Sequence, residues 1–157
     1  MPVTSEEEVS VDHKALGIIK NYAITEEQVR EFHEKFGHPC PNKPTMCTPG
    51  LTKLRVKLID EELTEVTEAL TRNNMADVLK ELCDLQYVVD GFFVSLGLDA
   101  VKEEAFMLVH QSNMSKLGPD GKPTYREDGK VLKGPNYKPV DNAKLEAILK
   151  KAGHKGD

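Results

Sequence analysis

No apolar run in this chain approaches the roughly 18 consecutive residues that a membrane-spanning helix needs. The opening segment MPVTSEEEVSVD is acidic and has no hydrophobic stretch, so it does not have the pattern of a signal peptide. We therefore expect no membrane contact and a cytoplasmic location.

The chain also lacks a basic excess. Lysine and arginine total 21 against 26 aspartates and glutamates, which gives a net charge of -5. General nucleic-acid binders normally carry a basic balance, so we expect no nucleic-acid partner. Small anionic substrates are not excluded, because bound metal ions supply positive charge locally.

Cysteines are few and odd in number. Cys83 lies in an apolar helical pattern, which predicts a buried free thiol in a reduced compartment. Cys40 and Cys47, taken with His33 and His38, are a poor zinc set because no C-x2-C pair is present.

The 157 residues are enough for one domain with a core. Their apolar periodicity predicts an all-α fold with five helices, at about 25–36, 51–71, 75–96, 99–116 and 142–151. We expect Thr25, Asp99 and Asp141 to begin or cap helices. The proline-rich residues 38–50 are expected to form a loop.

The tail has a different pattern. Residues 123–133, PTYREDGKVLK, predict a small β-hairpin around the Asp-Gly pair. We place it in a tail of about residues 118–140, within one domain of residues 24–157. Residues 1–23 have no period, so we expect an N-terminal arm that is partly disordered or lies over a neighbouring subunit.

The helix at 51–71 carries acids in an unexpected place. At about 100° per residue its apolar side chains share one sector, and Glu62, Glu65 and Arg55 fall inside that sector. Arg55 could pair with Glu62 or Asp84, or contact phosphate, and we favour the pairing.

The next helix has a matching strip. Asp77, Glu81 and Asp84 share a narrow sector of a helix that is apolar over most of its circumference, which predicts a central, mostly buried helix. If the two helices pair antiparallel, the strips can face each other, and unpaired buried carboxylates are costly. Magnesium prefers oxygen ligands and keeps positions for water and phosphate. The predicted ligands are Glu62, Glu65, Glu81 and Asp84.

Two alternatives compete with this interpretation. Acidic pairs on helices are usually solvated or form salt bridges, so one E-x-x-E pair alone says little. A di-iron helical bundle would need Glu-x-x-His on two helices, and no histidine here has a glutamate three residues before it.

The segments EELTE and ELCD, separated by fifteen residues, resemble the E-E-x-x-E … E-x-x-D signature of the all-α nucleoside triphosphate pyrophosphohydrolases. These are the MazG and phosphoribosyl-ATP pyrophosphohydrolase-like superfamily. The stretch VHQSNMSKLGPDGKPTYREDGKVLKGPNY is similar to a tail of one branch that includes phage members. The resemblance covers roughly residues 25–141, and would place a viral protein in the host cytoplasm.

The resemblance implies a MazG-like helical bundle that assembles as a dimer or tetramer, with active sites often completed by a neighbouring subunit. It also implies Mg²⁺-dependent cleavage between the α and β phosphates, with Mn²⁺ as a substitute. The family's metal ligands correspond to Glu62, Glu65, Glu81 and Asp84. Glu61 would bind a metal or activate water, Glu61 or Glu62 would take the proton, and Asp77 would be a supplementary ligand.

Basic and polar residues near the tail are candidates for substrate binding. In the branch that this chain resembles, Asn113 and Lys116 look like phosphate or sugar recognition, and the alternative is a polar helix end. The cations in or beside the hairpin would hold the polyphosphate, reach a neighbouring subunit's site, or simply be solvated. They are Lys122, Arg126, Lys130 and Lys133.

We therefore expect a pyrophosphohydrolase that converts a (d)NTP to a (d)NMP and pyrophosphate in nucleotide-pool control, favouring a purine deoxynucleotide such as dGTP or dATP. The alternatives are a phosphoribosyl-ATP pyrophosphohydrolase or a pyrimidine dNTP (dUTP or dCTP) hydrolase. A catalytically inert nucleotide-binding or oligomerisation module on the same fold is the alternative from another class.

Overall fold

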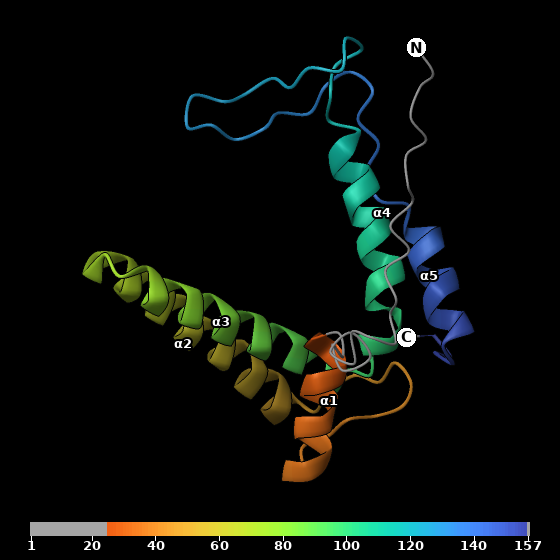
Figure 1. Cartoon of the computed structure of the whole chain (residues 1–157). Coiled ribbons are helices and arrows are strands. Elements are labelled where there is room, and N and C mark those ends of the chain that lie inside the picture. The colour runs from red at the N-terminus through yellow and green to blue at the C-terminus, as the bar shows by residue number, and fades with distance from the viewer. Residues whose placement is uncertain (1–24, 157) are drawn as a thin grey trace, which may run out of the picture.

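The computed structural model describes residues 25–156, which are helical and contain no sheet, so the all-α expectation is confirmed. The elements are α1 (Thr25–Phe36), α2 (Pro49–Arg72), α3 (Met75–Ser95), η2 (Asp99–Val101), α4 (Lys102–Met114) and α5 (Asn142–Lys151). Figure 1 shows α2 and α3 as a long antiparallel hairpin with α1 across one end, and α4 with α5 as a second pair at a steep angle to it. The expected arm at 1–23 lies outside the described residues.

The hairpin is defined by capping residues at the start of α2 and at the turn between α2 and α3. The Thr48 hydroxyl caps α2 by accepting a hydrogen bond from the Leu51 amide. Proline occupies the first turn of α2, where the amide donor that proline lacks would have no partner within the helix. Asn73 adopts the left-handed conformation (φ 52°) that ends α2. The Asn74 side chain then caps α3 by accepting from the Ala76 and Asp77 amides. This two-residue reversal sets which residues of α2 face which residues of α3.

The loop after α1 runs back against the C-terminal end of α3. Gly97 ends that helix with a φ of 64°. A Cβ at this position would lie 2.2 Å from the Lys43 carbonyl oxygen, so only glycine permits the close approach. The Thr45 amide donates to the Leu96 carbonyl oxygen across the same contact.

A buried charge network joins α1, α3 and α4. Asp90 is fully buried, and its carboxylate lies 2.6 Å from the Lys102 ammonium and 3.0 Å from the Gln86 amide nitrogen. Lys102 also binds Glu26 at 3.1 Å. Burial raises the pKa of Asp90, but the hydrogen bonds outweigh it and the net pKa is lowered. Asp90 therefore adds stability above its unfolded pKa of about 3.9, and this stability is lost as the pH falls through the folded value.

Asp99 does not cap a helix as expected. Its carboxylate accepts two hydrogen bonds from Arg30 of α1, at 2.6 and 2.9 Å. The bidentate pair holds Asp99 in η2, and α4 begins at Lys102 without a side-chain cap. A long-range ion pair has replaced the local cap that the spacing predicted.

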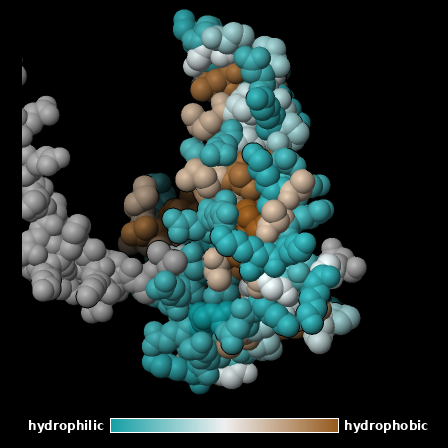
Figure 2. Space-filling model, turned by 90° about the vertical axis from the view of Figure 1, so that its right-hand side faces the viewer, coloured by the Kyte–Doolittle hydropathy of each residue, from teal (hydrophilic) through white to brown (hydrophobic). Residues whose placement is uncertain are grey.

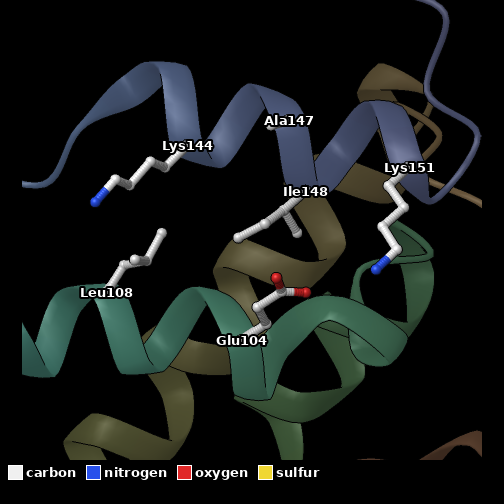
Figure 3. A pocket seen from close by; sticks show the side chains of 6 residues that line it. All are labelled: Glu104, Leu108, Lys144, Ala147, Ile148 and Lys151. Carbon is white, nitrogen blue, oxygen red and sulfur yellow. The ribbon is translucent and has the colours of Figure 1, made fainter.

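The joint between α4 and α5 is a small groove. Figure 3 shows Leu108 of α4 facing Ile148 of α5, with Glu104, Lys144 and Lys151 around them. Ile148 is buried in this contact. The expected cap of α5 is confirmed, because the Asp141 carboxylate accepts from the Ala143 amide.

The predicted β-hairpin is wrong. Within residues 25–156 the tail has only one isolated antiparallel bridge, between Tyr125 and Val131, and the rest is an extended loop. Both bridged side chains are exposed. Two short strands with no apolar face to bury are marginal in water, so the turn forms without a ladder.

The expectation that α3 is mostly buried is also wrong for a single chain. Its N-terminal half leaves Met75 80% exposed and Leu79 64% exposed, and Cys83 is an exposed rather than a buried free thiol. Exposed apolar side chains on one face of a helix, such as Met75, Leu79 and Leu82 of α3, often mark a place where another chain or ligand binds. Figure 2 shows a different face, seen from the side on which α5 lies in Figure 1, where apolar side chains also reach the surface among hydrophilic ones.

Replacing Lys102 with methionine should leave the Asp90 carboxylate buried and unpaired. Breaking a buried pair in this way costs about 3–5 kcal/mol, which we expect to see in the free energy of unfolding from urea denaturation. Asp90→Asn in the Lys102→Met background should restore much of the loss. The matched control is Arg126→Met, which removes an exposed pair with Asp128 and should leave stability unchanged. Equal effects of both substitutions would contradict this account of the network.

Candidate metal centre

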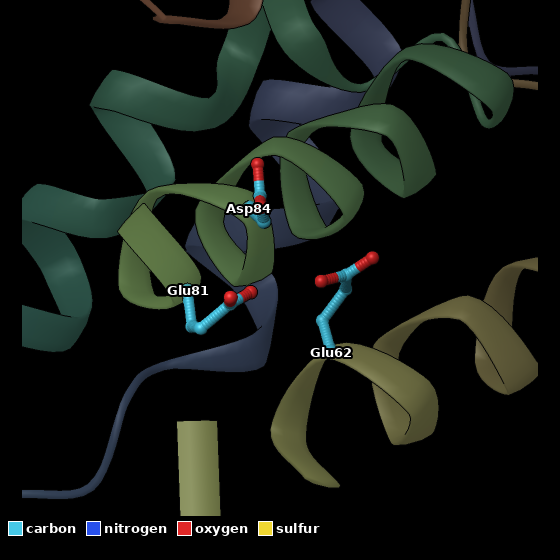
Figure 4. Close-up of side chains that lie close together, drawn as sticks. All are labelled: Glu62, Glu81 and Asp84. Carbon is cyan, nitrogen blue, oxygen red and sulfur yellow. The ribbon is translucent and has the colours of Figure 1, made fainter. Parts of the chain in front are cut away.

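Three carboxylates from the two helices of the hairpin converge. Glu62 extends from α2 towards Glu81 and Asp84 of α3, as Figure 4 shows. One oxygen from each lies within 4.8 Å of the others. Glu81 and Asp84 are three residues apart and so share a face of α3, while the asparagine turn brings Glu62 opposite them. Three like charges at this spacing need positive charge beside them.

Among the three acids, Glu62 requires a positively charged partner most, because part of its carboxylate is buried. Its Oε2 atom is buried and has no hydrogen-bond partner. Burial, followed by the charges of Glu65, Asp84 and Glu81, raises the pKa of Glu62. Glu81 is itself only 7% exposed. The cluster therefore presents an unsatisfied acceptor in a partly buried setting, which an oxygen-binding cation would satisfy.

Lys80 supplies part of the missing positive charge. Its ammonium lies 2.7 Å from Asp84 Oδ2 and 3.2 Å from Glu81 Oε1, and these hydrogen bonds raise the pKa of Lys80. The side chain is well exposed, so it can leave when another cation arrives. The acidic motif does not predict Lys80, although its position four residues before Asp84 is a spacing that favours ion pairs on a helix.

The other predicted acids lie around this group. Glu65 is exposed and outside the set of three, yet it is near enough for its charge to raise the pKa of Glu62. Glu61 pairs with Lys57 at 3.4 Å on the surface. Asp77 pairs in the same way with the arginine that ends α2. The assignments of Glu61, Glu65 and Asp77 to metal or water therefore remain predictions.

The favoured pairing of Arg55 with an acid of the cluster is wrong. No hydrogen bond or ion pair joins Arg55 to Glu62 or Asp84, all of which the structure describes. Arg55 is two turns before Glu62, about 10 Å along the helix axis. Its guanidinium lies instead beside His33 and Gly91, at the end of the hairpin that α1 covers.

The predicted substrate-binding residues are not brought to the acids within one chain. Asn113 and Lys116, at the end of α4, bind each other at 2.8 Å. Arg126 pairs with Asp128, and Lys133 lies over a tyrosine ring, while Lys130 is exposed in the same loop. Figure 1 shows α4 and this loop well apart from the middle of the α2–α3 hairpin. Their role in substrate binding remains a prediction.

The family model for phosphoribosyl-ATP pyrophosphohydrolase matches residues 29–113, which include α2, α3 and all three converging acids. The chain belongs to this family. The members of this family are hydrolases that act on a nucleotide anhydride, so the family resemblance found in the sequence is confirmed. In residues 25–156 no helix is both long and apolar enough to cross a membrane.

Two relatives of this chain are worth noting. An uncharacterised protein of Acanthamoeba polyphaga mimivirus is 30% identical over 115 residues, which are 71% of this chain and 43% of that protein. The chain thus spans about two fifths of that curated relative. It is also similar to a crystal structure of a candidate NTP pyrophosphohydrolase from Exiguobacterium sp. 255-15, at 26% identity, with 82% of this chain and 95% of that chain covered and a TM-score of 0.39.

Replacing Glu62 with glutamine should stabilise the metal-free protein. A raised folded pKa means that ionised Glu62 lowers stability at neutral pH, and that this penalty disappears as the pH falls through the folded value. In excess chelator, Glu62→Gln should melt above wild type at pH 7, and the difference should shrink towards pH 5, nearer the ordinary glutamate pKa of about 4.3.

The control for this experiment is Glu68→Gln, which changes an exposed acid on the same helix and should match wild type at both pH values. Adding Mg²⁺ should make wild type melt above Glu62→Gln, because of these two proteins only the wild type keeps the full ligand set and gains the full free energy of metal binding. A Glu62→Gln melting temperature at or below that of wild type in chelator at pH 7 would rule out the charge repulsion inferred here.

Proposed function

We propose that this protein is a metal-dependent nucleoside triphosphate pyrophosphohydrolase that releases pyrophosphate and a nucleoside monophosphate. The observation that supports it most is the convergence of three carboxylates on a buried, unpartnered Glu62 oxygen. An all-oxygen donor set with no nitrogen or sulfur ligand fits magnesium or manganese better than zinc. Membership of a family of nucleotide pyrophosphohydrolases points to the same reaction.

The proposed ligands are Glu62, Glu65, Glu81 and Asp84. A divalent cation held by them supplies Lewis-acid stabilisation of the phosphoryl oxygens and lowers the pKa of the attacking water. Glu61 or Glu62 accepts the water's proton. A bound cation would compete with Lys80 for Glu81 and Asp84, and the Lys80 ammonium would then be available to the polyphosphate.

The substrate that we favour is a purine deoxynucleoside triphosphate, used in control of the nucleotide pool. Phosphoribosyl-ATP and the pyrimidine nucleotides dUTP and dCTP are the alternatives. A triphosphate carries several negative charges, so positively charged side chains are needed in addition to the metal. We propose that Lys116, Arg126, Lys130 and Lys133 supply this charge, and that Asn113 binds the phosphates or the sugar through its neutral amide.

These residues reach the acids only if a second copy supplies them. In one chain, α4 and the loop after it lie away from the acid cluster, while apolar side chains of the outer part of the hairpin, such as Met75 and Leu79, are exposed. Burying this surface against another copy is favourable, and a two-fold arrangement would exchange the same surfaces in both directions. We therefore propose a dimer, or a tetramer built from dimers, with sites shared between copies.

A screen of common NTPs and dNTPs tests the reaction. With Mg²⁺ or Mn²⁺ the purified protein should release pyrophosphate and a monophosphate. Excess chelator should stop turnover, because without a cation between them the carboxylates repel the phosphates. Product identity is read by anion-exchange chromatography. Inorganic phosphate as the first product, or turnover that survives the chelator, would refute the assignment.

Two variants complete the screen. Asp84→Asn removes a proposed ligand and should reduce turnover by at least about 100-fold, while the protein stays folded, because carboxylate ligation by this residue is lost. Glu68→Gln, on the outer face of α2, should behave as wild type. An inert module on this fold would show no turnover with any variant or nucleotide.

Complementation tests the shared site. Glu62→Gln and Lys116→Ala should each be inactive alone, whereas co-refolded mixtures should recover about one quarter of wild-type activity per chain, because half of randomly formed dimers hold one intact site. A mixture of Glu62→Gln with Asp84→Asn is the control, since both changes lie in the acid cluster of one chain and no pairing restores it. No recovery in the first mixture, or full activity of Lys116→Ala alone, would contradict a site completed by a second copy.

A further inference from the structure

Four buried side-chain atoms in residues 25–156 have no hydrogen-bond partner. One is Glu62 Oε2, an acceptor in the acid cluster. The others are Arg55 Nε, Arg55 Nη2 and Ser95 Oγ, which are all able to donate. An unpartnered acceptor within a group of acids fits a site for a cation. Unpartnered donors fit an anionic ligand instead.

Arg55 is only 5% exposed and is enclosed by three parts of its own chain. A Cβ built on Gly91 of α3 would lie 3.3 Å from Arg55 Nη1 and 3.4 Å from His33 Nε2 of α1, so both nitrogens pack against the Gly91 backbone. His33 Nδ1 lies 3.2 Å from the Pro39 carbonyl oxygen, which can only accept, so Nδ1 carries the proton. Nε2 of the neutral ring is then the acceptor on the Nη1 side of Arg55.

The third part is the loop before α2. The Cys47 thiol donates weakly to the Ser95 carbonyl oxygen at 3.5 Å and is close enough to Arg55 to interact with it electrostatically. Burial raises the pKa of Cys47, so the thiol is neutral and offers no negative charge. Ser95 is one helical turn beyond Gly91 on the same face of α3, and its hydroxyl has no partner.

The two unpartnered atoms of Arg55, Nε and Nη2, form the edge of the guanidinium through which arginine commonly binds an oxyanion. Elsewhere in this chain, Arg30 binds the Asp99 carboxylate through the same two atoms, Nε at 2.6 Å and Nη2 at 2.9 Å. Arg55 has no such acid beside it. Arginine cannot shed its proton in a protein, and a buried unpaired charge is strongly unfavourable, so a counter-ion is required.

We propose that Arg55 and Ser95 form an internal binding site for a small oxyanion of the phosphate class, distinct from the acid cluster. The Nε and Nη2 atoms hold two of its oxygens, and the Ser95 hydroxyl donates to a third. The enclosure by α1, the preceding loop and α3 favours a small ion over a carboxylate carried by another chain. The bound ion links α1 to the hairpin, so it stabilises the joint between them.

Thermal unfolding in excess chelator tests the site without any contribution from metal or catalysis. Inorganic phosphate should raise the melting temperature of wild type saturably, by about 5 °C at a hundredfold excess over its dissociation constant, and chloride at equal ionic strength should not. Arg55→Met should abolish the phosphate effect. It should also melt above wild type in phosphate-free buffer, because a buried charge has been removed.

Arg30→Met is the matched control. This variant removes an arginine whose Nε and Nη2 atoms already bind the Asp99 carboxylate. It should therefore have a lower melting temperature than wild type and should keep the full stabilisation by phosphate. Ser95→Ala is a second, milder variant, and it should weaken phosphate binding several-fold while the protein stays folded. Because chelator prevents turnover, failure of the pyrophosphohydrolase assignment would leave these results unchanged.

The source of the oxyanion is separated by adding a nucleoside triphosphate in chelator. Stabilisation by inorganic phosphate, lost in Arg55→Met, identifies a free ion, whereas stabilisation by the triphosphate alone, lost in the same variant, identifies the phosphates of a nucleotide. The proposal is overturned if neither inorganic phosphate nor the triphosphate has a saturable effect on wild type, or if Arg55→Met retains the effect. It is also overturned if the phosphate-free melting temperature of wild type rises with protein concentration and Arg55→Met removes that rise, since the partner is then a carboxylate of a second copy.

Discussion

The pairing of α2 with α3 is the constraint on which the rest of the site depends. Two asparagines make the reversal, one in the left-handed conformation and one as a cap, and together they set the register. That register places Glu62 opposite Glu81 and Asp84, within 4.8 Å, at a depth where Glu62 cannot be fully solvated. A shift of one helical residue would turn Glu62 by about 100° and leave three ordinary surface acids.

Buried charges in this chain divide into those that are paired and those that are not. Asp90 is held by Lys102, and Asp99 by Arg30, and both pairs fix how α1 meets the remaining helices. Glu62 and Arg55 lack such partners although each has buried polar atoms. Unpaired buried charge is too costly to be retained as packing alone, so these two positions are where ligands of opposite sign are expected.

Local chemistry made much of the fold predictable. Asp141 caps its helix as predicted, because its side chain reaches a nearby amide, and such a contact is visible in sequence spacing. Thr48 and Asn74 cap helices through the same kind of short-range contact. The acid cluster was predictable for the same reason, since helical spacing fixes which side chains share a face. Long-range choices were not: Asp99 binds Arg30, 69 residues away, instead of capping its own helix. Arg55 lies in the expected sector of α2, but the direction of its side chain depends on Gly91 and α1, which periodicity cannot reveal.

The remaining errors share one physical cause, which is that exposure depends on assembly. Periodicity reports that a residue prefers burial without saying whether its own chain provides it, so the apolar N-terminal half of α3 was expected inside and is found at the surface. The acid cluster occupies that half, while the basic residues after α4 lie at the other end of a bent molecule (Figure 1). One chain thus separates the apolar surface and the acids from the cations that an anionic substrate would need. A second copy that covered the exposed part of α3 would lie directly beside the acid cluster, so burial of this surface and completion of the site would occur in the same step.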